Sequence, residues 1–292
     1  MLFFDSCKQA IEACLDTKTF AAARLYHDEK TMGIHIHDCY EIYYSISGGK
    51  QFLIDNRVYQ FAPGDIFFIN QYESHYLSEV DQLTHERIVL PVHPEYLKRF
   101  STAQTDLSYC FTCRNASSGH RVTLCAEERN RFLYYVHRLS EEKDFGQDIL
   151  DQAVFLEMMT FLTRIFRLRC AQESGGIPKD TPGRTGSHHA RIDEILSYVN
   201  QHLAEELSIP VLAAHFYLSS SYLCKIFKDE TGTTINRYIT AKRIAYAKAL
   251  LAEGHPVTET SSLCGFGDYS NFLKTFTRIV GISPKKYASC AQ

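Results

Sequence analysis

The stretch HIHDCYEIYYSISGG, residues 35–49, places two histidines one residue apart and a glutamate four residues after the second. Residues of one parity share a face of a β-strand. The odd-numbered polar side chains are therefore expected to point into one interior, joined by a histidine from another strand: His35, His37, Glu41, Tyr43 and His75. Imidazole and carboxylate groups bind transition metals, and they also hydrogen-bond organic ligands.

Three uses of these five side chains stay open. They can line a pocket for a small-molecule effector, or hold a metal in an isomerase or dioxygenase. They can also form a satisfied polar cluster in a domain that only dimerises or binds other proteins. We expect the effector pocket, with His35, His37, Glu41, Tyr43 and His75 as its contacts. We expect no catalytic residues, no metal and no cofactor.

Two similar segments near the C-terminus, 207–232 and 255–284, each contain a short helix, a turn and a second helix. In such a helix–turn–helix unit the first helix supports the second, which keeps one face free. The two free faces carry groups that bind base edges or phosphates, and we expect these residues to contact DNA: Ser220, Ser221, Cys224, Lys225, Lys228, Tyr269, Ser270, Asn271 and Lys274. In the second copy, the opposite face of the second helix is expected to bury Phe272, either Leu273 or Phe276, and Ile279.

Other elements must position these residues. Short alternating segments between about residues 30 and 92, with a turn at Asp55-Asn56, predict a β-barrel or sandwich. A helical pattern follows from Glu127 to Cys170, and one long helix over 234–254 would space the two C-terminal units. The apolar stripe of the first helical region can pack on the strands, form a dimer interface, or do both: Leu150, Val154, Met158, Phe161, Ile165 and Leu168.

Composition restricts the class of protein. The 292 residues are 45% hydrophobic and suit about two domains. We find neither an export signal nor a membrane helix, and expect a cytoplasmic protein with free thiols. From residue 186 onward, 11 Lys and Arg exceed 9 Asp and Glu, a net of +2, whereas the earlier residues have a net of −5. This permits a nucleic-acid partner for the C-terminal part. One group of residues is a weak match to a zinc site: Cys110, Cys113, His120 and Cys125. We expect its cysteines to be buried thiols.

Residues 190–288 resemble the DNA-binding domain of the AraC/XylS family of bacterial transcription regulators. The matching motifs are Leu212-Ala213-Ala214, Ser221-Tyr222-Leu223 with Phe227-Lys228, Gly232, Arg243, Gly265-Phe266, Asn271-Phe272, Phe276, Gly281-Ile282-Ser283-Pro284 and Tyr287. One departure is Thr260-Ser261, where the family usually has an apolar residue followed by Ala. The N-terminal region is similar to the cupin-like barrel of the same family. The resemblance implies two recognition helices that enter successive major-groove segments about 34 Å apart.

We therefore expect an α+β multidomain protein: a cupin-like effector-sensing barrel over residues 1–125, a helical dimerisation segment over 126–170, a linker over 171–189 and an all-α domain with two helix–turn–helix motifs over 190–292. Its expected function is sequence-specific regulation of transcription. The expected partners are double-stranded promoter DNA, a small-molecule effector such as a sugar, and a second copy of the chain; RNA polymerase is a further candidate. The alternatives are a metal-dependent cupin enzyme and a DNA-binding regulator whose barrel only dimerises.

Overall fold

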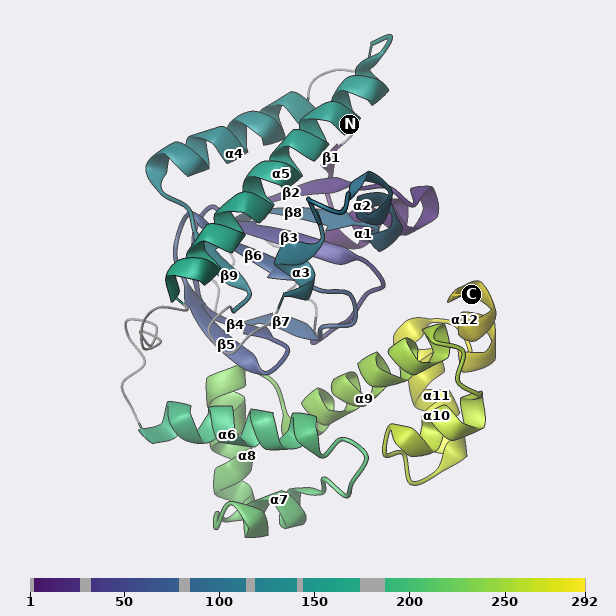
Figure 1. Cartoon of the computed structure of the whole chain (residues 1–292). Helices are drawn as coiled ribbons and strands as arrows, with labels where there is room; N and C mark the ends of the chain where they lie inside the picture. Colours follow the sequence, from purple (N-terminus) through teal and green to yellow (C-terminus); the bar gives the residue numbers. More distant parts are fainter. Residues whose placement is uncertain are drawn as a thin grey trace.

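The computed structural model describes residues 3–26, 33–78, 85–113, 119–140, 144–173 and 187–291. Figure 1 shows strands gathered in the N-terminal part, with two long helices beside them, and a C-terminal part made of helices. This arrangement confirms the α+β class. Among the described residues, no helix combines the length and the apolar character that crossing a bilayer requires.

The strands form two sheets. The larger sheet has the order β1 (Phe3–Phe4), β2 (Ala22–Tyr26), β8 (Glu86–Val92), β3 (Tyr40–Ser45), β6 (Asp65–Ile69) and β9 (Arg121–Thr123). The smaller sheet has the order β5 (Arg57–Phe61), β4 (Gly49–Ile54) and β7 (His75–Ser78). Neighbouring strands pair antiparallel, except for β1 and β2.

The predicted closed barrel is not observed, because no ladder joins the two sheets in the described part of the chain. The β4–β5 hairpin turns at Asp55-Asn56 as predicted, but it pairs with β7 and not with the larger sheet. The sheets face each other across aromatic rings whose centroids lie 4.8 to 6.1 Å apart: Tyr43, Phe52, Phe61 and Phe67. Rings of this size fill the space between two facing sheets.

Strand β3 is buried on both faces, and its residue parity separates two interiors. Tyr40, Ile42 and Tyr44 pack in one core with the helices, whereas Tyr43 packs in the other core, between the sheets. Glu41 shares the parity of Tyr43 and is also buried. The helices of this part are α1 (Cys7–Thr17), α2 (Pro94–Phe100), α3 (Tyr109–Thr112), α4 (Ala126–Leu139) and α5 (Gln147–Glu173).

Helices α4 and α5 realise the predicted helical pattern, and α5 covers the larger sheet (Figure 1). Met158 and Ile165 of the predicted stripe are buried in the core that α5 shares with that sheet. Leu150 and Leu168, at the two ends of the stripe, stay about half exposed. The stripe therefore packs mainly against the strands, which was one of the two predicted uses.

The C-terminal part contains only helices in its described residues, α6 to α12. Their bounds are α6 (Ser187–Gln201), α7 (Ile209–His215), α8 (Ser220–Thr231), α9 (Ile235–Ala252), α10 (Val257–Leu263), α11 (Tyr269–Val280) and α12 (Pro284–Ala291). Of the predicted linker, 174–186 lies outside the described residues, and the flanking positions belong to α5 and α6.

Candidate functional site

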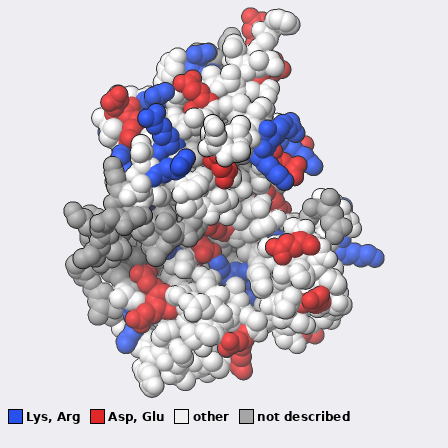
Figure 2. Space-filling view, viewed as in Figure 1, with Lys and Arg blue, Asp and Glu red and all other residues white. Residues whose placement is uncertain are grey.

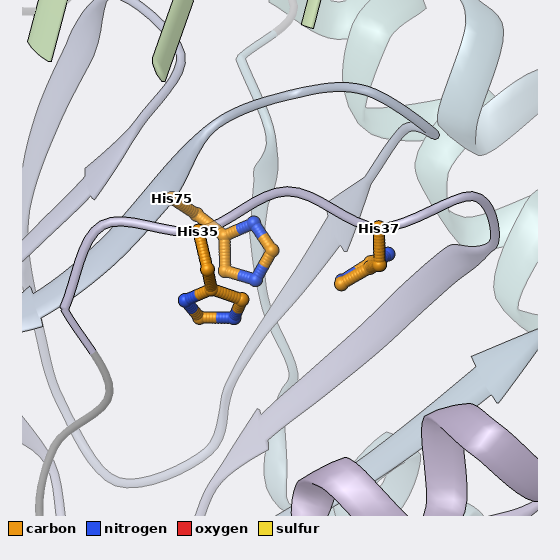
Figure 3. Close-up of side chains that lie close together, drawn as sticks. All are labelled: His35, His37 and His75. Carbon is orange, nitrogen blue, oxygen red and sulfur yellow. The ribbon is translucent and has the colours of Figure 1, made fainter. Parts of the chain in front are cut away.

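Three histidines gather at one end of the interior between the sheets. His35 and His37 lie on the segment before β3, and His75 begins β7; Figure 3 shows His75 beside His35, with His37 further along the same segment. One ring nitrogen from each lies within 4.8 Å of the others. Oε2 of Glu41 lies 3.0 Å from Nε2 of His37 and 3.8 Å from Nε2 of His75. The sequence prediction that these four side chains meet is confirmed.

Backbone pairing holds the rings in place. His35 and His75 form an isolated antiparallel bridge, in which each N–H donates to the other's carbonyl oxygen at 3.1 and 3.0 Å. Each of the three rings also has its Nδ1 within 3.1 Å of a carbonyl oxygen two residues away in the chain. A carbonyl oxygen can only accept, so Nδ1 carries the hydrogen. In His35 and His75 this leaves Nε2 as the nitrogen with a free lone pair.

The members of the cluster differ in the direction in which their pKa values are shifted. Burial, together with His75 and His37, lowers the pKa of His35 well below its ordinary value. Burial likewise lowers the pKa of His75 to about 4. Although burial opposes its ionisation, the hydrogen bond from His37 and the neighbouring rings lower the pKa of Glu41 to about 2. Glu41 therefore stays a carboxylate and pairs with His37, whose own pKa is raised despite its burial.

The fifth predicted contact, Tyr43, does not join this cluster. Its Oη lies 3.0 Å from Nε2 of His85, and Ser47 Oγ lies 3.3 Å from the other nitrogen of that ring. The pattern suspected of binding zinc does not converge either: His120 bonds the hydroxyl of Tyr59, and Cys125 is exposed at the start of α4. His85 is a polar interior residue that sequence spacing did not reveal, since its partner Tyr43 lies 42 residues away in the chain.

Behind His35 lies a cavity of about 510 Å³ between the N-terminal and C-terminal parts. Its N-terminal wall is Gly33, Ile34, His35, Ile36 and Tyr76. Its C-terminal wall comes from the end of α8, from α9 and from α11: Gly232, Thr233, Asn236, Arg237, Thr240, Ala241, Arg278 and Ile279. His35 is thus shared between the histidine cluster and the junction of the two parts.

The segment that carries the histidines also contacts the C-terminal helices. Oδ1 of Asp38 lies 2.7 Å from Nζ of Lys248, whose side chain is 4% exposed, and accepts a hydrogen bond of 2.8 Å from Oη of Tyr287. Asp38 directly follows His37 in the chain. Further contacts lie along the smaller sheet, where Lys242 of α9 pairs with Asp55 and Gln51 donates to the backbone oxygen of Asp229.

Helices α8 and α11 present the predicted polar faces. Each begins at a side-chain cap: Ser219 accepts from Tyr222 N–H, and Asp268 accepts from Asn271 N–H. Each ends at a glycine in the left-handed conformation. Of the predicted contacts, all are exposed except half-buried Cys224: Ser220, Ser221, Lys225, Lys228, Tyr269, Ser270, Asn271 and Lys274. Figure 2 shows acidic and basic side chains interspersed on the face viewed, rather than one continuous basic surface.

Helix α9 supports both units. Ile235, Tyr238 and Ile239 pack with the first unit, whereas Ile244 and Leu251 pack with the second. Thr260 and Ser261, the departure noted above, are both buried in α10. Ile279, which was predicted to be buried, is 40% exposed. The prediction was wrong because Ile279 faces the cavity beneath residues 33–36 and not the core of its own unit.

Comparison with known sequence families assigns both parts. The AraC-like ligand binding domain matches residues 18–159, and a helix-turn-helix domain matches residues 212–289. The chain belongs to the AraC family. It is therefore a transcription regulator with an N-terminal ligand-binding domain and a C-terminal DNA-binding domain. The enzyme alternative is not supported by this assignment.

Relatives of this AraC-family chain include a HTH-type transcriptional activator RhaS from Klebsiella pneumoniae (strain 342), 25% identical over 86% of the chain and 85% of the relative. The probable transcriptional regulator LumQ of Photobacterium leiognathi is 36% identical, but over 31% of the chain and 37% of LumQ. Among solved structures, the DNA-binding domain of AdpA in complex with a target DNA is 28% identical over 33% of the chain and 88% of that structure, with a TM-score of 0.32.

Proposed function

We propose that this regulator reads promoter DNA with the exposed faces of α8 and α11. The proposal is supported by one feature above all, the matched placement of polar side chains on the two helices. Lys225 and Lys274 each lie six residues after the cap of their helix, and both are exposed. Helix α9 supports the two units that contain α8 and α11. Side chains at equivalent positions of two helices held in this way suit two successive segments of one duplex.

The ligand-binding domain is proposed to take its effector at the cluster of His35, His37, Glu41 and His75. Imidazole and carboxylate groups can bond the hydroxyls of a sugar or coordinate an ion. Tyr43, bonded to His85, is a less direct contact than predicted. An effector that moves His37 also moves its neighbour Asp38, which contacts Lys248 and Tyr287 of the DNA-binding domain. Effector binding would thereby shift the population of domain arrangements.

A second copy of the chain is the proposed partner of the helical segment 126–170. Apolar side chains on the outer surfaces of α4 and α5 support a homodimer: Leu133, Tyr134, Ile149, Leu150 and Leu168. The sensing domain would span 1–125, the linker 171–189 and the DNA-binding domain 190–292. Action at promoters would put the protein in the cytoplasm, with RNA polymerase as a further partner.

Selection from a random duplex library with the full chain tests the DNA-binding proposal. We expect enrichment of sequences with two short conserved blocks about one helical turn apart. Fluorescence anisotropy with the enriched duplex should then give an affinity well above that for scrambled sequence. Enrichment of no sequence over random competitor would contradict the proposal.

A further inference from the structure

We propose that His35, His37 and His75, together with Glu41, bind a first-row transition-metal dication, and that this ion is a regulatory ligand of the chain. The inference deepens the proposed function and rests on it in treating the cluster as the effector site. It starts from the geometry of four side chains that come from two separate strands and one loop segment.

An unpartnered nitrogen points to an ion. Nε2 of His75 is buried without a hydrogen-bond partner, and its residue is 3% exposed. A buried polar atom without a partner is costly unless something binds it. Nδ1 of His75 is occupied by the carbonyl oxygen of Glu73, so the lone pair is on Nε2, which lies 3.8 Å from Oε2 of Glu41. The same argument leaves Nε2 of His35 free, since its Nδ1 faces the carbonyl oxygen of Gly33.

The donor set selects the class of ion. Neutral imidazoles with one carboxylate suit Zn²⁺, Fe²⁺, Co²⁺ or Ni²⁺, whereas Mg²⁺ and Ca²⁺ prefer oxygen donors. Each Nδ1–carbonyl bond fixes a ring in the orientation that a metal-binding histidine usually has. His37 would give up to solvent the proton that it now shares with Glu41, as metal binding at histidine requires.

The size of the cluster links the ion to the domain junction. Ligand nitrogens about 2.1 Å from a tetrahedral ion lie about 3.4 Å apart, whereas here they lie up to 4.8 Å apart. Binding would therefore draw segment 33–39 toward β7. Asp38 lies in that segment and contacts Lys248 and Tyr287, and His35 lines the cavity against α9 and α11. Closure around the ion would shift these contacts and so change how the DNA-binding domain is held.

Calorimetric titration of the chelator-treated full chain with Zn²⁺ or Co²⁺ tests the site. We expect one ion per chain, and for His75→Gln and His35→Gln an affinity lower by at least about 100-fold. His85→Gln, which changes a buried histidine outside the cluster, should bind as the unaltered chain does. Circular dichroism checks that each variant folds. If His75→Gln does not fold, the Zn²⁺ affinity of His35→Gln tests the site. Absence of binding, or binding equal in all variants, would overturn the site.

The regulatory half has its own test. The affinity of the full chain for its selected duplex is measured by anisotropy with Zn²⁺ and with chelator. We expect a change of about fivefold or more, matched by an equal effect of the duplex on Zn²⁺ affinity. Metal binding that leaves the DNA affinity unchanged would overturn the regulatory role. Failure of the DNA-binding proposal looks different, because the duplex would then not be bound under either condition.

Discussion

At the level of single residues, we assign the electrostatic part of DNA binding to Lys225 and Lys274. Both are exposed on the free faces of α8 and α11. We expect Lys225→Ala and Lys274→Ala each to weaken binding of the selected duplex by about 1–2 kcal/mol and to reduce the slope of log affinity against log salt by about 1. Anisotropy titrations over a range of salt concentrations measure both quantities.

The control for these variants is Lys98→Ala, which removes an exposed lysine of α2 in the ligand-binding domain. It should leave the affinity and its salt slope unchanged. If all three variants behave alike, the lysines act only through net charge, and the assignment of the two helix faces fails.

His85 gives the stability a pH dependence whose direction is fixed by its surroundings. Burial and the positive Arg87 lower its pKa to about 4, against about 6.5 in an unfolded chain. Between these values the unfolded state binds the proton more readily, so stability is complete above about pH 6.5 and falls as the pH drops toward 4. Urea unfolding should show a loss of about 1–2 kcal/mol from this residue between pH 7 and pH 5.

The variant His85→Gln isolates this effect. Its amide can still bond Tyr43 but does not titrate, so the loss of stability between pH 7 and pH 5 should be smaller than in the unaltered chain. An identical pH profile would mean that His85 takes up its proton equally well in both states.

Residue parity over positions 35–43 predicted that His35, His37 and Glu41 would share an interior, and they do meet, together with His75 of β7. It could not predict that Tyr43 would bond His85 instead. That partner lies 42 residues away in the chain and directly precedes β8, the neighbour of β3 in the larger sheet. Spacing within one segment carries no information about such a contact.

At the scale of elements, local chemistry predicted the helices well and the sheet closure poorly. The side-chain cap at Ser219 and the left-handed backbone at Gly265 are short-range features, and they occur where the two helix–turn–helix units were predicted. Whether β4 pairs with β7 or with the larger sheet depends on contacts between distant strands. The exposure of Ile279 has a similar origin, because its environment belongs to the other domain.

Glycine at the end of α8 has a role beyond ending the helix. Gly232 and Gly281 both have left-handed backbones, with φ of 73° and 86°. A Cβ at Gly232 would lie 2.3 Å from Ser78 Oγ, whereas one at Gly281 would meet nothing within 4 Å. Gly281→Ala should therefore cost about 1–2 kcal/mol of backbone strain, and Gly232→Ala should cost clearly more. Urea unfolding of the full chain gives the comparison.

The excess cost of Gly232→Ala would measure the close approach of α8 to β7, since the two variants share the same backbone strain. Equal losses would show that the junction yields without cost at Ser78, and that the end of α8 does not need its glycine for domain contact.

On the scale of the whole molecule, the arrangement of the domains could not be read from the sequence. The sequence indicated a difference in charge sign between the two parts, but not which charges would meet. Asp38 and Lys248 are 210 positions apart, and Lys242 pairs with Asp55 across a similar separation. These pairs join a strand-rich domain to a helix, so neither hydrophobic periodicity nor capping residues report on them.

Asp38 is the residue on which this arrangement can be tested most directly. Nζ of Lys248 is buried beside it, and a buried ammonium that loses its carboxylate is destabilised where it lies. Asp38→Asn keeps an acceptor for Tyr287 but removes the charge, so Lys248 should seek water and the domains should separate more often. Hydrogen–deuterium exchange should then become faster in segment 33–39 and in α12.

Asp16→Asn, a change at an exposed site of α1, should leave both rates unaltered. Unchanged exchange in Asp38→Asn would mean that the other junction contacts, among them Lys242 with Asp55 and Gln51 with Asp229, hold the domains together without this charge, and that movement of Asp38 cannot transmit an effector signal to the DNA-binding domain.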